Sequence, residues 1–362
     1  MSRRVTATID LGALRRNLAR IGERCPQSRV MAVVKADGYG HGLERVARAL
    51  AAADAFGVAS IADGERIRAI GLDNRVVVLS GIDEPGDLAL MRQYRLEPVI
   101  HHQQQLAWLE ADPDRRPLPV WLKADTGMHR LGFAPDQVQA AYRRLAALPQ
   151  IAGRIQLMSH FARSDEFGQA TTADQIGQFQ AAIDGLPGPV SLANSAAILG
   201  WPASHRDWLR AGGLLYGVSV VAGRSGADFG FEPAMTLSAR VVAIRQLRAG
   251  DAVGYGGAWT CPQDMAIGVV AIGYGDGYPR LARAGTPVHL HGRPAAIVGR
   301  VSMDLLTIDL RGHPQAAVGN EVMLWGPGLP VETIGEGAGT LGYELICGMT
   351  RRVDFIEIDQ GS

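Results

Sequence analysis

The sequence predicts an α/β fold in two parts, an N-terminal (β/α)8 barrel followed by a mainly antiparallel β domain. Between residues 30 and 217, short apolar runs alternate with amphipathic helical stretches. After residue 217 the sequence becomes glycine-rich and then forms long β-branched runs separated by turns. A chain of 362 residues is also too long for one ordinary core. We therefore expect two domains, at residues 1–228 and 229–362.

The first part has the spacing of βα units. Eight strand-like runs lie at 30–36, 55–60, 75–80, 96–101, 118–125, 153–161, 189–194 and 208–215. Helical patterns lie between them at 43–53, 62–70, 85–94, 103–110, 135–147 and 172–183. A closed, TIM-like parallel barrel is the economical arrangement, because it leaves no sheet edge unpaired. An open doubly wound sheet is the structural alternative.

The second part reads as antiparallel strands. The runs lie at 237–247, 266–272, 286–291, 294–310 and 321–325, and 331–338 and 343–349 are helical in pattern. His291-Gly292-Arg293 predicts a hairpin turn. Residues 5–10 form a strand before a helix at 11–25, and the sequence leaves open which domain that strand joins.

Composition limits the function classes. The 36 basic and 36 acidic residues give no net charge, which indicates neither a nucleic acid partner nor an anionic membrane. The three cysteines form no pattern of a disulfide framework or a zinc site, so no metal is expected. The N-terminus lacks a continuous apolar signal region, and no stretch has the length of a membrane span. We expect a cytoplasmic protein that acts on a small molecule.

Residues 31–42 carry the strongest functional signal. An apolar run ends on Lys35 and passes at once into a glycine-rich turn that contains Tyr39. Burying an ammonium costs several kcal/mol unless it is paired or deprotonated, so a lysine there is suited to forming a Schiff base. Glycine amides before a helix start suit a phosphate. Lysine beside a phosphate site indicates pyridoxal phosphate; a solvated lysine beside a flexible turn is the alternative.

Other polar residues lie in or just after different strands, which favours the barrel because its strand ends form one active face. They are Lys123, Arg130, His160, Asn194, Ser195 and Arg210, the last followed by Gly212 and Gly213. Each also has an ordinary structural explanation, such as an ion-paired surface arginine, a core histidine or a helix cap. In the second part, Tyr255 lies between glycines and a strand runs through Met303. Residues 337–342 match G-x-G-x-x-G but follow a helical stretch, which argues against a dinucleotide site.

Together these stretches resemble the bacterial alanine racemase family. The resemblance rests on residues 32–42, 123–132, 193–195, 253–256, 272–277 and 298–304, in order over nearly the whole chain. It implies a barrel followed by a β domain, pyridoxal 5'-phosphate as cofactor, and a homodimer. The implied activity interconverts L-alanine and D-alanine through a cofactor aldimine with two bases, for peptidoglycan synthesis or alanine catabolism.

The resemblance also implies roles for individual residues. Lys35 would form the aldimine and act on the D form, while Tyr255 of the partner subunit would act on the L form. Arg130 and the backbone N–H of Met303 would bind the substrate carboxylate. The cofactor contacts would be Lys35, Tyr39, Arg130, His160, Ser195, Arg210, Gly212 and Gly213. Arg210 would face the pyridine nitrogen. The lysine at the position of Lys123 can be carbamylated in similar proteins, where it positions the arginine.

The sequence departs from the family near the C-terminus. Arg352-Val353 leads into Asp354-Phe355 where similar proteins continue Pro-Arg, and Arg351 stands where some place a cofactor-contacting tyrosine. Trp259 replaces a tyrosine common after Tyr255. Three other functions remain open: a non-catalytic pyridoxal phosphate carrier, a decarboxylase or aldolase on the same fold, and a racemase for serine or a broader set of amino acids. The carrier is disfavoured by the second domain and Tyr255, and decarboxylation by the carboxylate contacts.

Overall fold

The computed structural model describes residues 5–151, 153 and 155–359. Contacts divide the chain into two compact units. One unit is Arg15–Leu215, and the other combines the chain up to Leu14 with the chain from Tyr216 onward.

The second unit thus begins again at Tyr216, whereas we expected the boundary between residues 228 and 229. The segment after Tyr216 is tied to the second unit by hydrogen bonds that no sequence pattern announces. The backbone N–H groups of Ser219 and Gly226 both donate to Oε1 of Glu332 at 2.8 Å. Burial raises the pKa of Glu332, although these N–H groups oppose the shift. A buried carboxylate therefore anchors residues 216–228 to a helix of the second unit.

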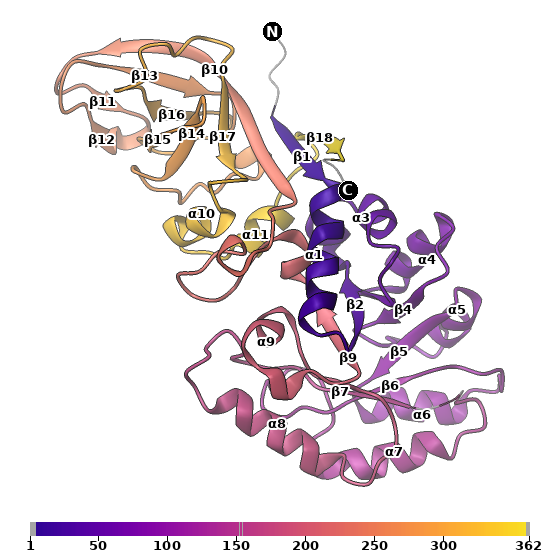
Figure 1. Ribbon diagram of the computed structural model, residues 1–362. Coiled ribbons are helices and arrows are strands. Elements are labelled where there is room, and N and C mark those ends of the chain that lie inside the picture. The colour runs from indigo at the N-terminus through magenta and orange to yellow at the C-terminus, as the bar shows by residue number, and fades with distance from the viewer. Residues whose placement is uncertain (1–4, 152, 154, 360–362) are drawn as a thin grey trace. The chain divides into compact units, whose positions relative to one another are not determined.

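The first unit is a closed barrel of eight parallel strands in chain order, which confirms the predicted fold class (Figure 1). The strands are β2 (Arg29–Val33), β3 (Ala55–Val58), β4 (Arg75–Val78), β5 (Leu96–Ile100), β6 (Trp121–Lys123), β7 (Gln156–Met158), β8 (Val190–Ser191) and β9 (Trp208–Ala211). The barrel closes because β2 pairs with both β3 and β9. Each strand is shorter than its apolar run. The candidate residues lie at the strand ends, as Lys123 in β6 and Arg210 in β9 do, or in the segments that follow, and so at one rim of the barrel.

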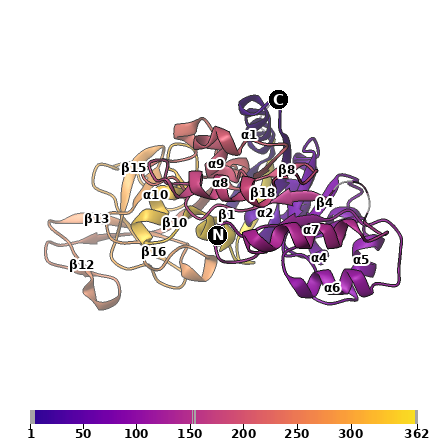
Figure 2. The ribbon, with the colours of Figure 1, turned by 90° about the horizontal axis from the view of Figure 1, so that it is seen from below.

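Helices cover the outside of these strands (Figures 1 and 2). They are α3 (Leu43–Ala49), α4 (Ile61–Ala69), α5 (Asp87–Gln93), α6 (Gln103–Ala111), α7 (Val138–Ala146), α8 (Thr171–Ala182) and α9 (Ser195–Gly200), with short 3-10 turns η1 (Pro135–Gln137) and η2 (Pro202–Ser204). Two further short segments, α2 (Lys35–Tyr39) and η3 (Gly213–Tyr216), follow β2 and β9. Helix α7 shows why these segments pack on the barrel as helices. Its apolar residues Val138, Ala141, Tyr142 and Leu145 recur at helical spacing, so they lie on one face, and this face is buried. Among the described residues, no helix has the length and apolar character to cross a membrane.

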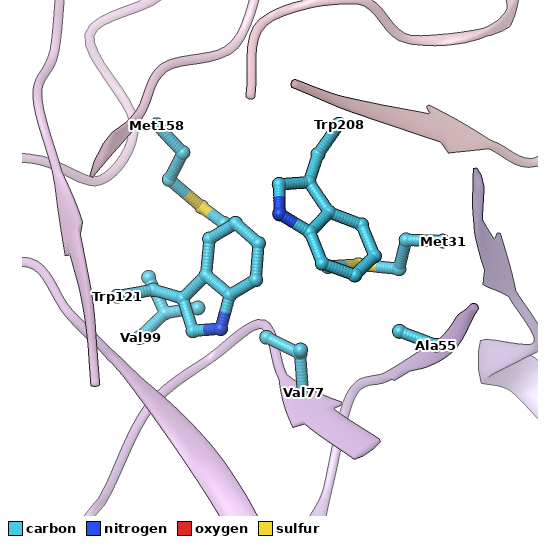
Figure 3. Close-up of a cluster of buried hydrophobic side chains, with 7 residues drawn as sticks. All are labelled: Met31, Ala55, Val77, Val99, Trp121, Met158 and Trp208. Carbon is cyan, nitrogen blue, oxygen red and sulfur yellow. The ribbon is translucent and has the colours of Figure 1, made fainter. Parts of the chain in front are cut away.

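The barrel interior is filled by side chains from seven of its strands (Figure 3). They are Met31, Ala55, Val77, Val99, Trp121, Met158 and Trp208. The two indole rings meet edge to face, with centroids 5.8 Å apart. The Trp121 indole N–H donates to Glu97 Oε2 at 2.8 Å, and Arg75 pairs with the same carboxylate. The interior is thus a packed core, and in such barrels the site lies at the rim that the strand ends form.

The second unit is an eight-stranded sheet in the order β13-β16-β15-β14-β17-β10-β1-β18. Its strands are β1 (Thr6–Asp10), β10 (Met235–Leu247), β13 (Met265–Val270), β14 (Pro287–Leu290), β15 (Arg293–Val298), β16 (Leu306–Asp309), β17 (Glu321–Trp325) and β18 (Asp354–Ile358), with a separate pair β11 (Ala252–Val253) and β12 (Trp259–Thr260). The unit also contains α10 (Val331–Ala338), α11 (Gly342–Cys347) and the turns η4 (Ala227–Phe229), η5 (Tyr255–Gly257) and η6 (Tyr274–Asp276). Helix α1 (Leu11–Arg24) follows β1 and runs past the division at Leu14.

Pairing in this sheet answers the question that the sequence left open. Strand β1 pairs antiparallel with β10 and parallel with β18, so the first strand belongs to the second unit. The predicted hairpin turn is confirmed, because Leu290 pairs with Arg293 across His291 and Gly292, both at positive φ. Strand β10 also pairs with β13. The six strands β13, β16, β15, β14, β17 and β10 therefore form a closed ring in which each strand pairs with two others.

The single strand predicted at 294–310 is wrong. The structure has two strands there, β15 and β16, separated by residues 299–305. Gly299 takes a φ of +71°, and the Ser302 N–H donates to the Leu305 carbonyl at 2.9 Å. Met303 therefore lies in a turn rather than on a strand, a difference that bears on its proposed role.

Candidate active site

Lys35 begins a left-handed turn at the rim of the barrel. Strand β2 ends at Val33, and α2 (Lys35–Tyr39) is helical only in its hydrogen bonds, because φ is 53° at Ala36, 53° at Asp37 and 52° at Tyr39. A left-handed conformation costs a non-glycine residue roughly 1–2 kcal/mol, somewhat less for aspartate. The predicted tight turn is present, and its strain indicates that the surrounding structure holds it in place.

Backbone contacts hold this turn closely. The Gly40 N–H donates to the Ala36 carbonyl at 2.9 Å, and the Gly42 N–H donates to the Asp37 carbonyl at 2.8 Å. At Gly38, whose φ is +63°, a Cβ would lie 2.9 Å from Val46 Cγ2 on α3. The turn is therefore packed directly on the following helix, which fixes the points where Lys35 and Tyr39 leave the backbone.

A small cradle lies beside Tyr39. A Cβ on Gly212 would lie 2.5 Å from Tyr39 Oη and 3.9 Å from Ser195 Oγ, so glycine keeps this space open. Ser195 Oγ accepts the Gly212 N–H at 2.9 Å and the Leu214 N–H at 3.4 Å. Because the oxygen is already an acceptor for these amides, its own hydrogen points elsewhere and suits an anion. Gly213 follows in the same loop.

Ser195 begins α9, whose start is capped by its neighbour. The Asn194 side-chain oxygen accepts the Ala197 N–H at 3.0 Å, and it also accepts the Ser164 hydroxyl at 2.9 Å. The sequence left a cap and a phosphate contact as alternatives at this helix start. The structure shows that Asn194 provides the cap, and a phosphate contact of Ser195 stays a prediction.

Arg210 is buried in the barrel, and among the described residues no carboxylate pairs with it. Its guanidinium donates to three backbone carbonyls, those of Ser159, Ser191 and Leu192, and to the Ser191 hydroxyl. It also lies 3.2 Å from His160 Nδ1. Burial lowers the pKa of Arg210 to about 10, so the group stays charged near neutral pH. A fixed, uncompensated cation at this depth suits an anion or a lone pair.

His160 is neutral in this surrounding. Burial, followed by the charges of Arg210, Lys123 and Arg130, holds the pKa of His160 well below its usual value. A guanidinium can only donate, so Nδ1 of His160 accepts and the ring proton is on Nε2. Arg210 thus selects the tautomer of His160.

Lys123 ends β6 and is also buried. Burial, together with the charges of Arg210 and Arg130, lowers the pKa of Lys123 to about 8. Lys35 contributes to the same shift, so the structure brings four cationic side chains close enough to affect one another. Among the described residues, the Lys123 amine has no hydrogen-bond or ion-pair partner.

Arg130 is exposed and follows an ordered loop. Oδ1 of Asp125 accepts the N–H groups of Gly127, Met128 and His129 at 3.0–3.1 Å. Burial alone would raise the pKa of Asp125, but these N–H groups outweigh it and hold the pKa below its usual range. The ordered loop fixes the backbone before Arg130 and leaves its guanidinium able to reach a ligand.

Tyr255 and Met303 lie on the second unit. Tyr255 is in η5 between Gly254 and Gly256, both at positive φ, and 70% of its side chain is exposed. Met303 is 52% exposed. Tyr255, Ser302 and Leu305 line one pocket, so the two loops lie side by side.

Sequence reasoning missed the group that fixes the Met303 turn. Arg352 Nε lies 3.0 Å from Asp276 Oδ1, and Nη2 lies 2.5 Å from Asp304 Oδ1. The Gly275 N–H donates to the Met303 carbonyl at 2.9 Å. Arg352 therefore joins the turn at 302–304 to the motif at 272–277.

The G-x-G-x-x-G match at 337–342 lies at the junction of α10 and α11, so it is not part of a βαβ unit.

The predicted site residues thus form two groups. The barrel unit brings together Lys35, Tyr39, Lys123, Arg130, His160, Ser195, Arg210, Gly212 and Gly213. The second unit holds Tyr255 and Met303 in adjoining loops. Among the described residues, no group of three or more histidine, cysteine or acidic side chains is placed to hold a metal.

Comparison with known proteins covers nearly the whole chain. Residues 9–220 match the model of the alanine racemase N-terminal domain, and residues 234–357 match that of the alanine racemase C-terminal domain. An alanine racemase of Nitrosococcus oceani is 51% identical over 96% of this chain and 97% of its own length.

Solved structures of alanine racemases also match this chain over nearly its whole length. The biosynthetic alanine racemase of Pseudomonas aeruginosa has a TM-score of 0.95 at 44% identity, covering 99% of this chain and 100% of that one. The alanine racemase of Bartonella henselae with covalently bound pyridoxal phosphate has a TM-score of 0.89 at 25% identity, with the same coverage. The chain described here belongs to the alanine racemase family.

Proposed function

We propose that the chain interconverts L-alanine and D-alanine with pyridoxal phosphate as cofactor and with Lys35 and Tyr255 as the two bases. Alanine racemisation is the activity of the family to which the chain belongs. The observation that carries the assignment of the site is the position of Lys35, at the end of a barrel strand, among cations and beside an anion cradle. When bound, the cofactor delocalises the negative charge left on an amino acid's α-carbon when its proton is removed.

The residues present fit this cofactor. The cradle at Gly212 is bordered by the hydroxyls of Tyr39 and Ser195, which suit a phosphate. Arg210, held by carbonyls and by His160, would lie against the pyridine nitrogen. Because Arg210 stays protonated, it would donate to that nitrogen and oppose its protonation, which disfavours transamination as a side reaction.

The substrate carboxylate would be held from two sides. Arg130 offers a planar guanidinium at the end of an ordered loop. The turn that contains Met303 offers a backbone N–H, fixed through Arg352. Racemisation then needs a proton acceptor on each face of the α-carbon. We assign the amine of Lys35 to the D form and the phenol oxygen of Tyr255 to the L form.

Lys123 is suited to react with carbon dioxide. Its lowered pKa of about 8 provides the uncharged amine near neutral pH. That amine attacks the carbon of CO2, forms an N–C bond and releases one proton, which leaves a carbamate with one negative charge. The carbamate would replace a buried cation by an anion among Arg210 and Arg130 and would position Arg130.

A homodimer would complete the site. Tyr255, Tyr274, Met303 and Leu305 are 39–70% exposed on the second unit. Exposed aromatic and apolar side chains in adjoining loops are typical of an interaction surface. We propose that Tyr255 reaches the barrel of a partner subunit, so that the dimer has two shared sites.

Circular dichroism of L-alanine tests the activity directly. With cofactor-loaded protein, we expect the signal to decay to zero as the enantiomers equalise. Lys35→Ala should lower the rate by at least about 10³-fold, because both the proton acceptor and the cofactor's anchor are lost. A signal that stays flat for loaded wild-type protein would contradict the proposal and favour a carrier of pyridoxal phosphate or a racemase for another amino acid.

Subunit mixing tests the shared site. Lys35→Ala and Tyr255→Ala chains are each expected to be inactive as homodimers. After subunit exchange, each heterodimer should contain one intact site, and activity should return to roughly a quarter of wild type at equal mixing. If activity stays absent although mass spectrometry shows heterodimers, Tyr255 does not act across the interface.

A further inference from the structure

The left-handed turn after Lys35 is also held through the side chain of Asp37. Oδ1 of Asp37, at the centre of the turn, accepts the Leu43 N–H at 3.1 Å. The same oxygen accepts Nη2 of Arg66 at 2.7 Å. Arg66 lies on α4, so it joins the strained turn to a helix of the neighbouring βα unit. Neither the motif at residues 31–42 nor the family resemblance pointed to this residue.

Arg66 is shared between two carboxylates. Its Nε and Nη2 bind the two oxygens of Glu44 at 2.7 and 2.9 Å, while Nη2 also binds Asp37. Glu44 is in the first turn of α3, directly after the left-handed turn. The guanidinium thus fixes the turn and the helix that follows it at the same time. Asp63 lies at 3.8 Å from Nη1 and completes the acidic surroundings.

We infer that Arg66 is a positioning residue, which acts through Asp37 to keep residues 36–40 left-handed and so sets the positions of Lys35 and Tyr39. The inference rests on the proposed function for what Lys35 and Tyr39 do. Arg66 and Asp37 are 41% and 53% exposed, and an ion pair at such a place contributes little to overall stability. Its effect is local, because the turn it holds is strained and would open to relieve the strain.

The barrel contains a second ion pair that serves as a matched control. Arg144 on α7 binds Glu110 on α6 with Nε and Nη2 at 2.7 and 2.8 Å, and a third contact goes to Gln103 at 2.6 Å. The side-chain exposures are 40% and 35%, against 41% and 38% for Arg66 and Glu44. Both arginines join neighbouring helices of the barrel with the same geometry. Arg66 alone of the two also binds the left-handed turn.

Arg66→Met and Arg144→Met therefore separate positioning from general stability. We expect both variants to fold and to lose a similar, small amount of thermal stability. Hydrogen exchange of the holoenzyme should show at least tenfold faster exchange of the Gly42 and Leu43 amides in Arg66→Met, and less than twofold change in Arg144→Met. Both amides bond to Asp37, so they report on the turn. Asp37→Asn keeps an acceptor for Leu43 but loses the charge, and we expect an intermediate effect.

A second measurement links the turn to the cofactor. The rate at which pyridoxal phosphate leaves the diluted holoenzyme, followed by its absorbance, should rise at least threefold in Arg66→Met and not in Arg144→Met. Arg66→Lys keeps the charge without the planar fork, so it should restore part of the slow release.

Two results would overturn the inference. One is equal exchange of the Gly42 and Leu43 amides in Arg66→Met and Arg144→Met. The other is faster exchange with unchanged cofactor release, which would mean that the turn does not position the cofactor's contacts. Failure of the wild-type chain to bind pyridoxal phosphate would instead refute the proposed function, and the exchange comparison would still decide whether Arg66 holds the turn.

Discussion

The barrel unit and the second unit differ in how completely each fixes its own part of the candidate site. Arg210 is 5% exposed and has all its hydrogen-bond partners within the barrel. Tyr255 is 70% exposed on a short turn between two glycines. The barrel therefore builds the cofactor side of the site in advance. Tyr255 lies on an exposed surface, which under the proposed function is completed by a partner subunit.

The difference has a physical reason. Binding a phosphate and a charged ring requires donors and cations held in place in a low-dielectric interior, which a barrel rim provides. Under the proposed function, Tyr255 has only to bring one phenol to the far face of the substrate, which depends mainly on its backbone position. In the second unit, Gly254 and Gly256 permit the positive φ of the turn that carries Tyr255, and the ion pairs of Arg352 hold the adjoining turn at 302–304. Perturbing the two regions should accordingly produce different kinds of defect.

The largest expected effect is on proton exchange at Tyr255. Tyr255→Phe removes one hydroxyl from an exposed ring, so the barrel and its cofactor should be unaffected. We expect racemisation to fall about 10²- to 10⁴-fold, the usual loss for a general base. In deuterated water, mass spectrometry should still detect α-hydrogen exchange of D-alanine by Lys35, while exchange of L-alanine is lost. Equal losses for both enantiomers would contradict the division of roles.

A smaller effect is expected at the cradle. In Gly212→Ala the new Cβ would lie 2.5 Å from Tyr39 Oη, so the hydroxyl must move out of the phosphate position. We expect pyridoxal phosphate affinity, measured by absorbance titration, to fall at least about tenfold, which is about 1.4 kcal/mol. Gly177→Ala in α8 is the control, because a Cβ there meets nothing within 4 Å. Equal affinities of the two variants would show that the cradle does not bind the phosphate.

The smallest expected effect is the pH dependence caused by Lys123. Its pKa is about 8 in the fold and 10.5 in the unfolded chain, so between these values the unfolded state binds more protons. Stability should therefore rise with pH from 8 to 10.5, by roughly 1–3 kcal/mol, and the cost of the buried charge is fully present below pH 8. Urea unfolding of wild type against Lys123→Met, in buffer free of CO2, isolates this contribution.

The same urea unfolding, repeated with added bicarbonate as a source of CO2, tests whether Lys123 forms a carbamate. If the Lys123 amine forms a carbamate, wild type at pH 7.5 should gain stability on addition of bicarbonate, and Lys123→Met should not. Parallel pH profiles of the two proteins would show that burial of Lys123 carries no such cost.

Several features follow from local sequence. The alternation of apolar runs and helical stretches predicted the barrel, because burial of a parallel sheet demands that pattern. The glycines around Lys35 predicted a turn, and His291-Gly292 predicted a hairpin, since both depend on backbone conformations that few residues adopt. The family resemblance predicted the roles, and these stay proposals residue by residue.

Other features depended on residues distant in the chain. The apolar run at 294–310 hid a turn, because β-branched residues continue on both sides of Gly299 and only the pairing of β15 with β16 reveals the break. The change of composition after residue 217 did not show which domain residues 216–228 join, and we assigned them to the barrel domain. The amides of Ser219 and Gly226 bond to Glu332, far along the chain. Arg66 and Arg352 carry no local signal, since an arginine's partners are chosen by packing.

The sequence by itself thus determined most of the helices and strands, the order of the two parts and the chemistry available at each strand end. These depend on side-chain periodicity and on residue type, both of which are local. Only the tertiary structure decided that the turn after Lys35 is left-handed and that Arg66 ties it to α4. It also showed that Arg210 selects the tautomer of His160. Such details arise from contacts between side chains on separate elements, and a backbone strain is retained only where those contacts hold it.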